Sequence, residues 1–170
     1  MSEKVARLAV QQLRKNMFPQ LPQDIQDLFP KTTDPLGPRP ADGSIPDLDQ
    51  VPNIMVGQYQ DFGANAGTLL VTVYSSGSAE GIVKVYRHLE LYVDIWVSSA
   101  ESSNVEARRI ASIIYEYIFR NLHNKNWSGE NIQIERCYEI ERSPILFDGQ
   151  NKICHIANVY RVEALSAVWY

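Results

Sequence analysis

The chain has little of what most catalytic and metal-binding sites are made of. Its 170 residues include only two cysteines and three histidines. Cys137 and Cys154 are too widely spaced for a redox or zinc CxxC motif, and His88, His123 and His155 form no HExxH or HxH array. We therefore expect buried free thiols, structural histidines, and no metal or cofactor. A cross-strand disulfide is the alternative for the cysteines, although it is unusual in a cytosolic protein.

Nucleophile and phosphate-binding motifs are also missing. No serine lies in a GxSxG motif, and neither Gly-rich stretch, residues 63–67 or 77–81, is followed by the Lys-Ser/Thr of a P-loop. We expect a protein that is not an enzyme, with no catalytic residue and no cofactor-binding residue. The alternative is an enzyme with an unrecognised site around His88, Glu90 or Asp94.

Long apolar runs are absent as well. No segment approaches the roughly 20 residues of a membrane span, and the charged N-terminal stretch lacks the apolar core of a signal peptide. These features predict a protein made in a cytoplasm, without a membrane partner. The net charge of −4 argues against general nucleic-acid binding, which usually needs a basic face.

The most informative stretch, residues 89–122, predicts a strand followed by a long helix. Apolar residues alternate with polar or aromatic ones along the strand, which indicates one buried face: Leu89, Leu91, Val93, Ile95 and Val97. Ser103 is a candidate N-cap, with Glu106 three residues later as a capping box. A helix over 104–122 is predicted by apolar residues at helical spacing: Ala107, Ile110, Ala111, Ile114, Tyr117, Ile118 and Leu122.

The N-terminal third has a different character. Residues 3–17 predict an amphipathic helix that Pro19 ends. Eight of the nine prolines then fall within residues 19–52, which makes continuous helix or central strand improbable there. We interpret this segment as an extended arm or a plain surface loop, with a short apolar turn at Leu21, Ile25, Leu28 and Phe29.

The remaining segments predict strands. Candidates are residues 53–60 and 68–74, then a flexible loop over 75–81, and one or two strands over 82–97. After the helix, residues 123–129 are expected to close it. Later strands cover residues 132–141, 145–147 and 152–163, with a tight turn at Asp148-Gly149.

This order of elements predicts one domain of the α+β class: a mostly antiparallel sheet with one long helix packed on one face, an N-terminal helix and a long Pro-rich arm. The expected division is an N-terminal helix over 1–18, the arm over 19–52 and an α+β core over 53–170.

Two features of the strands suggest surface roles. Tyr92 and Trp96 lie on the strand face opposite the aliphatic residues, so they form an interface unless another layer of the monomer covers them. Glu135, Glu139 and Glu141 share one face of a later strand. They are better explained as a solvated face that discourages edge pairing than as a cation site.

The order of strands and helix resembles the tail terminator and tail-to-head joining proteins of long-tailed bacteriophages. The resemblance spans most of residues 50–166 and rests on four stretches: residues 53–59, residues 87–97, residues 106–118, and the Asp148-Gly149 hairpin with the strand over 160–165.

The resemblance implies a structural virion protein, present in the tail or neck and assembled in the host cytoplasm. Its members form a homohexameric ring that caps the last ring of tail-tube protein, with the sheath as a further possible neighbour, and meets head-completion proteins. DNA passes through such a ring without sequence-specific binding. The alternatives are another head-tail connector or neck subunit, or a non-viral protein-binding α+β module that uses an exposed sheet edge.

Overall fold

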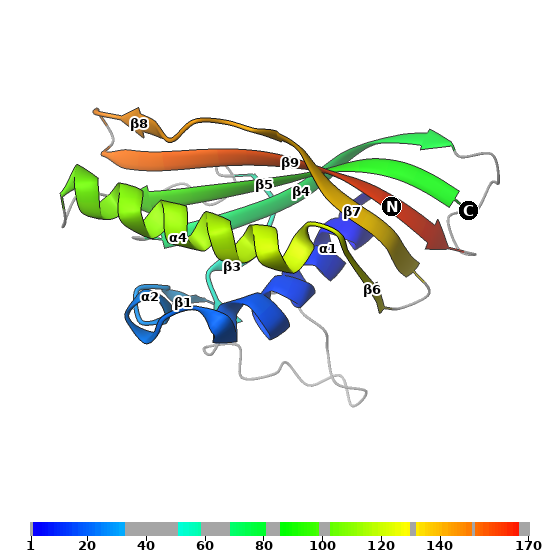
Figure 1. Cartoon of the computed structure of the whole chain (residues 1–170), viewed down its shortest axis with the longest axis horizontal. Helices are drawn as coiled ribbons and strands as arrows, with labels where there is room; N and C mark the ends of the chain where they lie inside the picture. The colour runs from blue at the N-terminus through cyan, green and yellow to red at the C-terminus, as the bar shows by residue number, and fades with distance from the viewer. Residues whose placement is uncertain are drawn as a thin grey trace.

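The computed structural model describes residues 2–32, 51–58, 69–80, 86–98, 103–129, 132–150 and 152–166. The expected α+β class is confirmed: a curled seven-stranded sheet carries its helices on one face (Figure 1). Within these ranges, no helix is long and apolar enough to cross a membrane.

The sheet is mixed. Its strand order is β3-β4-β5-β9-β7-β6, with β8 also pairing with β9. The pairing of β3 with β4 is parallel, and the other described pairings in this sheet are antiparallel. The strands are β3 (Ile54–Val56), β4 (Leu69–Glu80), β5 (Tyr86–Ser98), β6 (Lys125–Gly129), β7 (Ile132–Arg142), β8 (Leu146–Asp148) and β9 (Ile153–Ser166).

The long helix α4 (Asn104–Leu122) forms where the sequence predicts it. The Ser103 hydroxyl accepts a hydrogen bond from the Glu106 amide at 3.1 Å, which satisfies one of the unpaired N–H groups of the first turn. The buried stripe faces β5 and β9. It has the predicted members, except that Tyr117 is only partly buried and Asn121 is buried.

The N-terminal helix is also present, but Pro19 does not end the helical path. α1 (Ser2–Gln12) continues as a π-helical turn, η1 (Leu13–Met17), and then as a 3-10 turn, η2 (Phe18–Gln20). Pro19 fits at the start of this last turn because proline lacks only a donor that is unpaired there. The apolar stripe packs against the sheet beside α4.

Part of the Pro-rich segment is described. The short helix α2 (Gln23–Gln26) anchors the predicted apolar turn, with Leu21, Ile25 and Phe29 buried and Leu28 exposed. A small ladder pairs β1 (Lys31–Thr32) with β2 (Val51–Pro52). Residues 33–50, where most of the expected arm falls, lie outside the described residues.

Strand β3 is held from two sides. Arg14 of η1 donates two hydrogen bonds to the Ile54 carbonyl, at 3.0 and 2.6 Å. At its end, Gly57 has φ 138°, which favours glycine, and its amide donates to the Val73 carbonyl at 2.9 Å. The strand is therefore shorter than the predicted 53–60, of which residues 59 and 60 lie outside the described ranges.

Two expectations about loops are wrong. Residues 75–80 continue β4, with a register shift between Ser76 and Ala79, instead of forming a flexible loop. Residues 125–129 form β6 instead of simply closing the helix. Asn124 adopts a left-handed conformation with φ 56° and turns the chain directly into this strand.

Strand β7 changes phase along its length. Register shifts between Ile134 and Arg136, and again between Glu139 and Glu141, interrupt its pairing with β9. After the first shift Cys137 turns into the core, while Ile140 becomes exposed. The expected regular alternation is therefore wrong beyond Ile134, because each bulge adds a residue and reverses the faces.

The predicted hairpin is present, because β8 turns into β9, but the tight turn at Asp148-Gly149 is wrong: Asp148 still belongs to β8 and pairs with Ile153, so the connection is formed by the four residues 149–152. The last strand, β9, is buried on one face only. Its even-numbered residues from Cys154 to Ala164 are buried, while the alternate residues are partly or fully exposed. The sheet thus has a helix-covered face with the main core and a second face, called the open face because none of the described helices packs on it, where Met55 and Leu70 form a small buried cluster.

Candidate functional site: an aromatic and acidic pocket on the open sheet face

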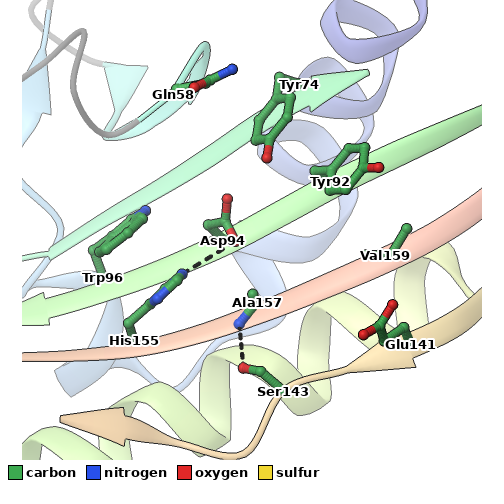
Figure 2. Close-up of a pocket in the computed structure, with 10 residues that line it drawn as sticks. All are labelled: Gln58, Tyr74, Tyr92, Asp94, Trp96, Glu141, Ser143, His155, Ala157 and Val159. Atoms are coloured by element: carbon green, nitrogen blue, oxygen red, sulfur yellow. Dashed lines mark hydrogen bonds and ion pairs between the residues drawn. The ribbon is translucent and has the colours of Figure 1, made fainter. Parts of the chain in front are cut away.

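The open face of the sheet carries a pocket of about 590 Å³. It extends across β4, β5 and β9, opposite the helices, and reaches the chain just after β7 (Figure 2). Its lining is Gln58, Tyr74, Tyr92, Asp94, Trp96, Glu141, Ser143, His155, Ala157 and Val159.

Two stacked pairs of rings stand at either end of the pocket. Tyr74 and Tyr92 are register partners on β4 and β5, and their rings stack with centroids 4.8 Å apart and an interplanar angle of 5°. Trp96 and His155 are partners on β5 and β9, with centroids 3.7 Å apart and also 5° between planes. Cross-strand pairing thus orients all four rings.

Asp94 lies between the two stacks, on the same strand face as Tyr92 and Trp96. It is 9% exposed, and its Oδ1 is 3.2 Å from His155 Nε2. The Trp96 indole N–H donates to Thr72 Oγ1 at 3.1 Å, and Trp96 packs on Met55 and Leu70. These contacts hold the floor of the pocket in one arrangement.

The pocket is electronegative. Asp94 and Glu141 contribute carboxylates, and no lysine or arginine belongs to the described lining. Partial burial, reinforced by the charge of Asp94 and by Tyr92, raises the pKa of Tyr74. Tyr92 donates to Glu90 at 2.7 Å just outside the pocket, which fixes the orientation of its ring.

Ser143 forms the edge of the pocket where β7 gives way to β8. Its amide donates to the Ala157 carbonyl at 2.8 Å, and its Oγ accepts from the Ala157 amide at 2.9 Å. The same hydroxyl donates to the Pro144 carbonyl at 2.8 Å. Between β7 and β8 the chain is not in a strand, and Ser143 supplies the hydrogen bonds to β9 that a strand would make there.

The arrangement has features of a binding surface. Asp94 and His155 are paired as in a catalytic triad, but the Ser143 hydroxyl is engaged with backbone groups on both its donor and acceptor sides. No group of three potential metal ligands occurs within the described part of the chain. Half-buried aromatic faces beside carboxylates are features of a binding surface.

The other two histidines lie outside the pocket. His123 accepts a hydrogen bond from the Glu139 amide at 3.0 Å through Nδ1 and stacks on Phe119, which is the structural role expected for it. His88 is 3.8 Å from Glu163. The alternative enzymatic grouping of His88, Glu90 and Asp94 shares one strand face, yet Asp94 pairs with His155 instead.

The cysteines are buried free thiols, as predicted. Cys154 points into the core while its neighbour His155 faces the pocket, and Cys137 lies in the core beside β9. Burial raises the pKa of both thiols. The alternative disulfide is wrong, because Cys137 pairs with Val162 of β9, which lies eight positions along that strand from Cys154.

The three glutamates of β7 do not act as one group. Glu139 accepts hydrogen bonds from Tyr115 and Asn158 on the helix-covered face. Glu135 is exposed, and Glu141 lies at the pocket. The register shift between Glu139 and Glu141 places these two side chains on opposite faces of the sheet. The prediction that the three glutamates share one face is therefore wrong.

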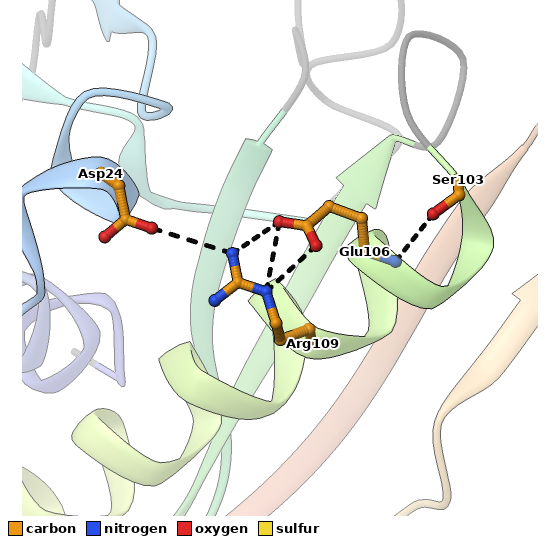
Figure 3. Close-up of polar contacts among 4 residues, drawn as sticks. All are labelled: Asp24, Ser103, Glu106 and Arg109. Atoms are coloured by element: carbon orange, nitrogen blue, oxygen red, sulfur yellow. Dashed lines mark hydrogen bonds and ion pairs between the residues drawn. The ribbon is translucent and has the colours of Figure 1, made fainter.

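The charged residues at the start of α4 form a surface network (Figure 3). Arg109 pairs with Glu106 and lies 3.7 Å from Asp24 of α2. The hydrogen bond from Arg109 lowers the pKa of Glu106, which in turn raises the pKa of Arg109. Because all three residues are exposed, the network orients α2 against α4 without much effect on stability.

Sequence reasoning identified only part of this site. It singled out Tyr92 and Trp96 as exposed aromatics, and these form the pocket. It did not single out Tyr74, and it did not connect Glu141 or His155 with the two aromatics, because all three come from other strands. The information that would identify the whole site lies in the pairing of β5 with β4 and β9. This pairing brings Trp96 beside His155, although the two residues are 59 positions apart in the sequence.

Comparison with known proteins gives a likeness of fold. No protein-family model matches the sequence, and no curated protein matches it significantly. Among solved structures, a chain of the virion of a native gene transfer agent (GTA) particle is similar, with a TM-score of 0.51. The two chains are 10% identical, and the match covers 67% of this chain and 79% of that one. The chain therefore shares its fold with a subunit found in a virion.

Proposed function

We propose that this protein is a structural subunit of a phage-like virion, specifically a tail terminator. In this role it forms a ring that caps the tail tube and joins it to the head-neck region. The observation that supports the proposal most directly is the fold shared with a chain of the gene transfer agent virion. The order of strands and helix, which resembles tail terminator and joining proteins, points the same way.

The surface of the monomer is compatible with assembly. One face of the sheet is covered by α1, η1 and α4, whereas the other presents half-buried aromatic residues in an open pocket. In a ring, each subunit uses one surface to contact a different surface of its neighbour, and closure follows from the rotation between them. The open face and the helix-covered side offer two such different surfaces.

The net charge of −4 is also consistent with a ring around a DNA passage. Like charge suppresses contacts between protein and phosphate groups, so a non-basic subunit would let DNA pass without specific binding. In this proposal the partners are other copies of the chain, the tail-tube protein, and head-completion proteins.

The decisive experiment is the solution mass of the purified protein over a concentration series, with and without tail-tube protein, by light scattering after gel filtration and by native mass spectrometry. We expect about six times the mass of one chain, either alone or after tail-tube protein is added. A ring of a different copy number would favour another neck subunit over a terminator.

A second candidate is a protein-binding module, which the open pocket favours. It predicts a monomer at every concentration and saturable one-to-one binding of a partner. A strictly monomeric protein in the presence of tail-tube protein would contradict the terminator proposal and favour this alternative.

A further inference from the structure

We propose that the pocket on the open sheet face binds an arginine side chain presented by a partner protein chain. This inference goes beyond the proposed function, because it concerns the chemistry of the pocket and holds for a ring subunit and for a monomeric binding module alike. Four observations carry it: the charge of the lining, the geometry of the rings, the position of Asp94, and the open form of the pocket.

The charge of the lining selects a cation. Asp94 and Glu141 supply two carboxylates, and the described lining contains no lysine or arginine to neutralise them. Asp94 is mostly buried, and among the described residues its hydrogen-bond partner is His155, at Oδ1. A mostly buried carboxylate beside a pocket is stabilised by a cationic guest, which supplies a compensating charge together with hydrogen-bond donors.

The rings favour a planar cation over a point charge. Tyr92 and Trp96 are four residues apart on β5, so their side chains stand about 13 Å apart with Asp94 between them, and a guanidinium held by Asp94 contacts one of the two rings, not both. Each ring is held in a stacked pair, so its orientation is fixed before a guest arrives. A guanidinium stacks on aromatic faces while donating several hydrogen bonds to carboxylates, and an ammonium group does not combine these contacts.

The form of the pocket favours a side chain over a free small molecule. The lining comes from the floor of an open sheet face, with Gln58 and Ser143 at two opposite sides, as Figure 2 shows. Sites for small molecules usually bury most of the ligand surface. An arginine in a polypeptide needs only its side chain enclosed, because its backbone gains further contacts along the sheet face.

The test uses the full chain and three probes: a blocked Gly-Gly-Arg-Gly-Gly peptide, the same peptide with neutral citrulline in place of arginine, and free L-arginine. The readout is the NMR resonance of the Trp96 indole N–H, identified with the Trp96→Phe variant. Trp127 lies on β6, outside the pocket. Because the chain has three tryptophans, the Trp127→Phe variant identifies its indole resonance, which is the internal reference in the same spectrum.

We expect the arginine peptide to shift the Trp96 resonance saturably and to leave Trp127 unchanged. The citrulline peptide has the same shape without the charge and should bind at least about tenfold more weakly. Free L-arginine should also bind more weakly than the peptide, because its own carboxylate meets Asp94 and Glu141.

Two variants and a control test whether the arginine peptide binds in the pocket. Glu141→Gln changes an exposed residue, so it keeps the fold, and should weaken binding of the arginine peptide several-fold. Asp94→Asn should weaken it further. Glu135→Gln removes one charge from an exposed position of the same strand, outside the pocket, and should leave binding unchanged.

Three outcomes would overturn the inference. Equal binding of the citrulline and arginine peptides would show that the pocket does not recognise charge. Free L-arginine binding as tightly as the peptide would indicate a site for a free ligand. No shift of Trp96 at the highest soluble peptide concentration, with the wild-type protein folded, would exclude an arginine pocket.

Discussion

At the scale of single residues, the helix-covered side of the sheet contains a polar cluster inside an apolar core. Glu139 accepts hydrogen bonds from Tyr115 at 2.8 Å and from Asn158 at 3.3 Å. Tyr160 is fully buried nearby, and its hydroxyl has no hydrogen-bond partner among the described residues. Burial, reinforced by the charge of Glu139, raises the pKa of Tyr160, so its hydroxyl stays protonated and unpaired.

The Tyr115 hydroxyl is hydrogen-bonded and the Tyr160 hydroxyl has no partner among the described residues, so replacing each tyrosine by phenylalanine should have opposite effects on stability. Tyr160→Phe removes a buried, unpaired hydroxyl, so we expect the protein to be unchanged or stabilised by up to about 1 kcal/mol. Tyr115→Phe removes a hydroxyl that donates to a carboxylate, so we expect it to be destabilised by about 1 kcal/mol. Urea unfolding monitored by circular dichroism measures both. A loss of stability in Tyr160→Phe equal to that in Tyr115→Phe would contradict the assignment.

At the scale of elements, α4 depends on its first turn. Ser103 adopts an extended conformation with φ −78° and ψ 158°, and its hydroxyl caps the Glu106 amide. We expect Ser103→Ala to lower the free energy of unfolding by about 1 kcal/mol, because the amide loses its acceptor. Thermal or urea unfolding measures the change.

The matched control is Ser112→Ala, the same substitution at an exposed position within α4. Alanine has the higher helix propensity, so this variant should be equal to the wild type or slightly more stable. Ser103→Asp keeps an acceptor at the cap and should retain most of the stability. A Ser103→Ala variant as stable as Ser112→Ala would mean that the cap does not contribute.

The same element shows what the sequence can predict. Helix α4 was predicted with its bounds and cap because a long amphipathic period and a capping residue are local signals. Strand β7 was predicted in extent but not in phase. Its two register shifts arise from pairing with β9, and no local pattern marks where Cys137 turns inward.

At the scale of the whole molecule, the pocket could not be predicted from the sequence, because it too depends on which strands pair. Tyr92 and Trp96 could be recognised as exposed aromatics from one strand alone. Their partners Tyr74 and His155 become neighbours only when β4 and β9 flank β5, and this strand order is a property of the complete sheet. The electronegative character of the site follows from that order, because it places Asp94 at the centre.

The expected division into an N-terminal helix, an arm and a core leads to the last prediction. Residues of α1, η1, α2 and α4 share one continuous buried cluster with the sheet. Leu13 of η1 and Ile114 of α4 are both fully buried in it. Because they contribute to the same core, we expect Leu13→Ala and Ile114→Ala each to destabilise the whole protein by about 2–5 kcal/mol.

We expect both variants to unfold in one transition, with far-ultraviolet circular dichroism and aromatic fluorescence giving the same midpoint. Val105→Ala, at a position of α4 that is 78% exposed, is the control and should be almost neutral. If the N-terminal helix were a separate unit, Leu13→Ala would produce an early loss of helical signal while the sheet transition stayed at the wild-type midpoint. A single lowered transition would instead mean that residues 2–17 are part of the one core that supports the open sheet face.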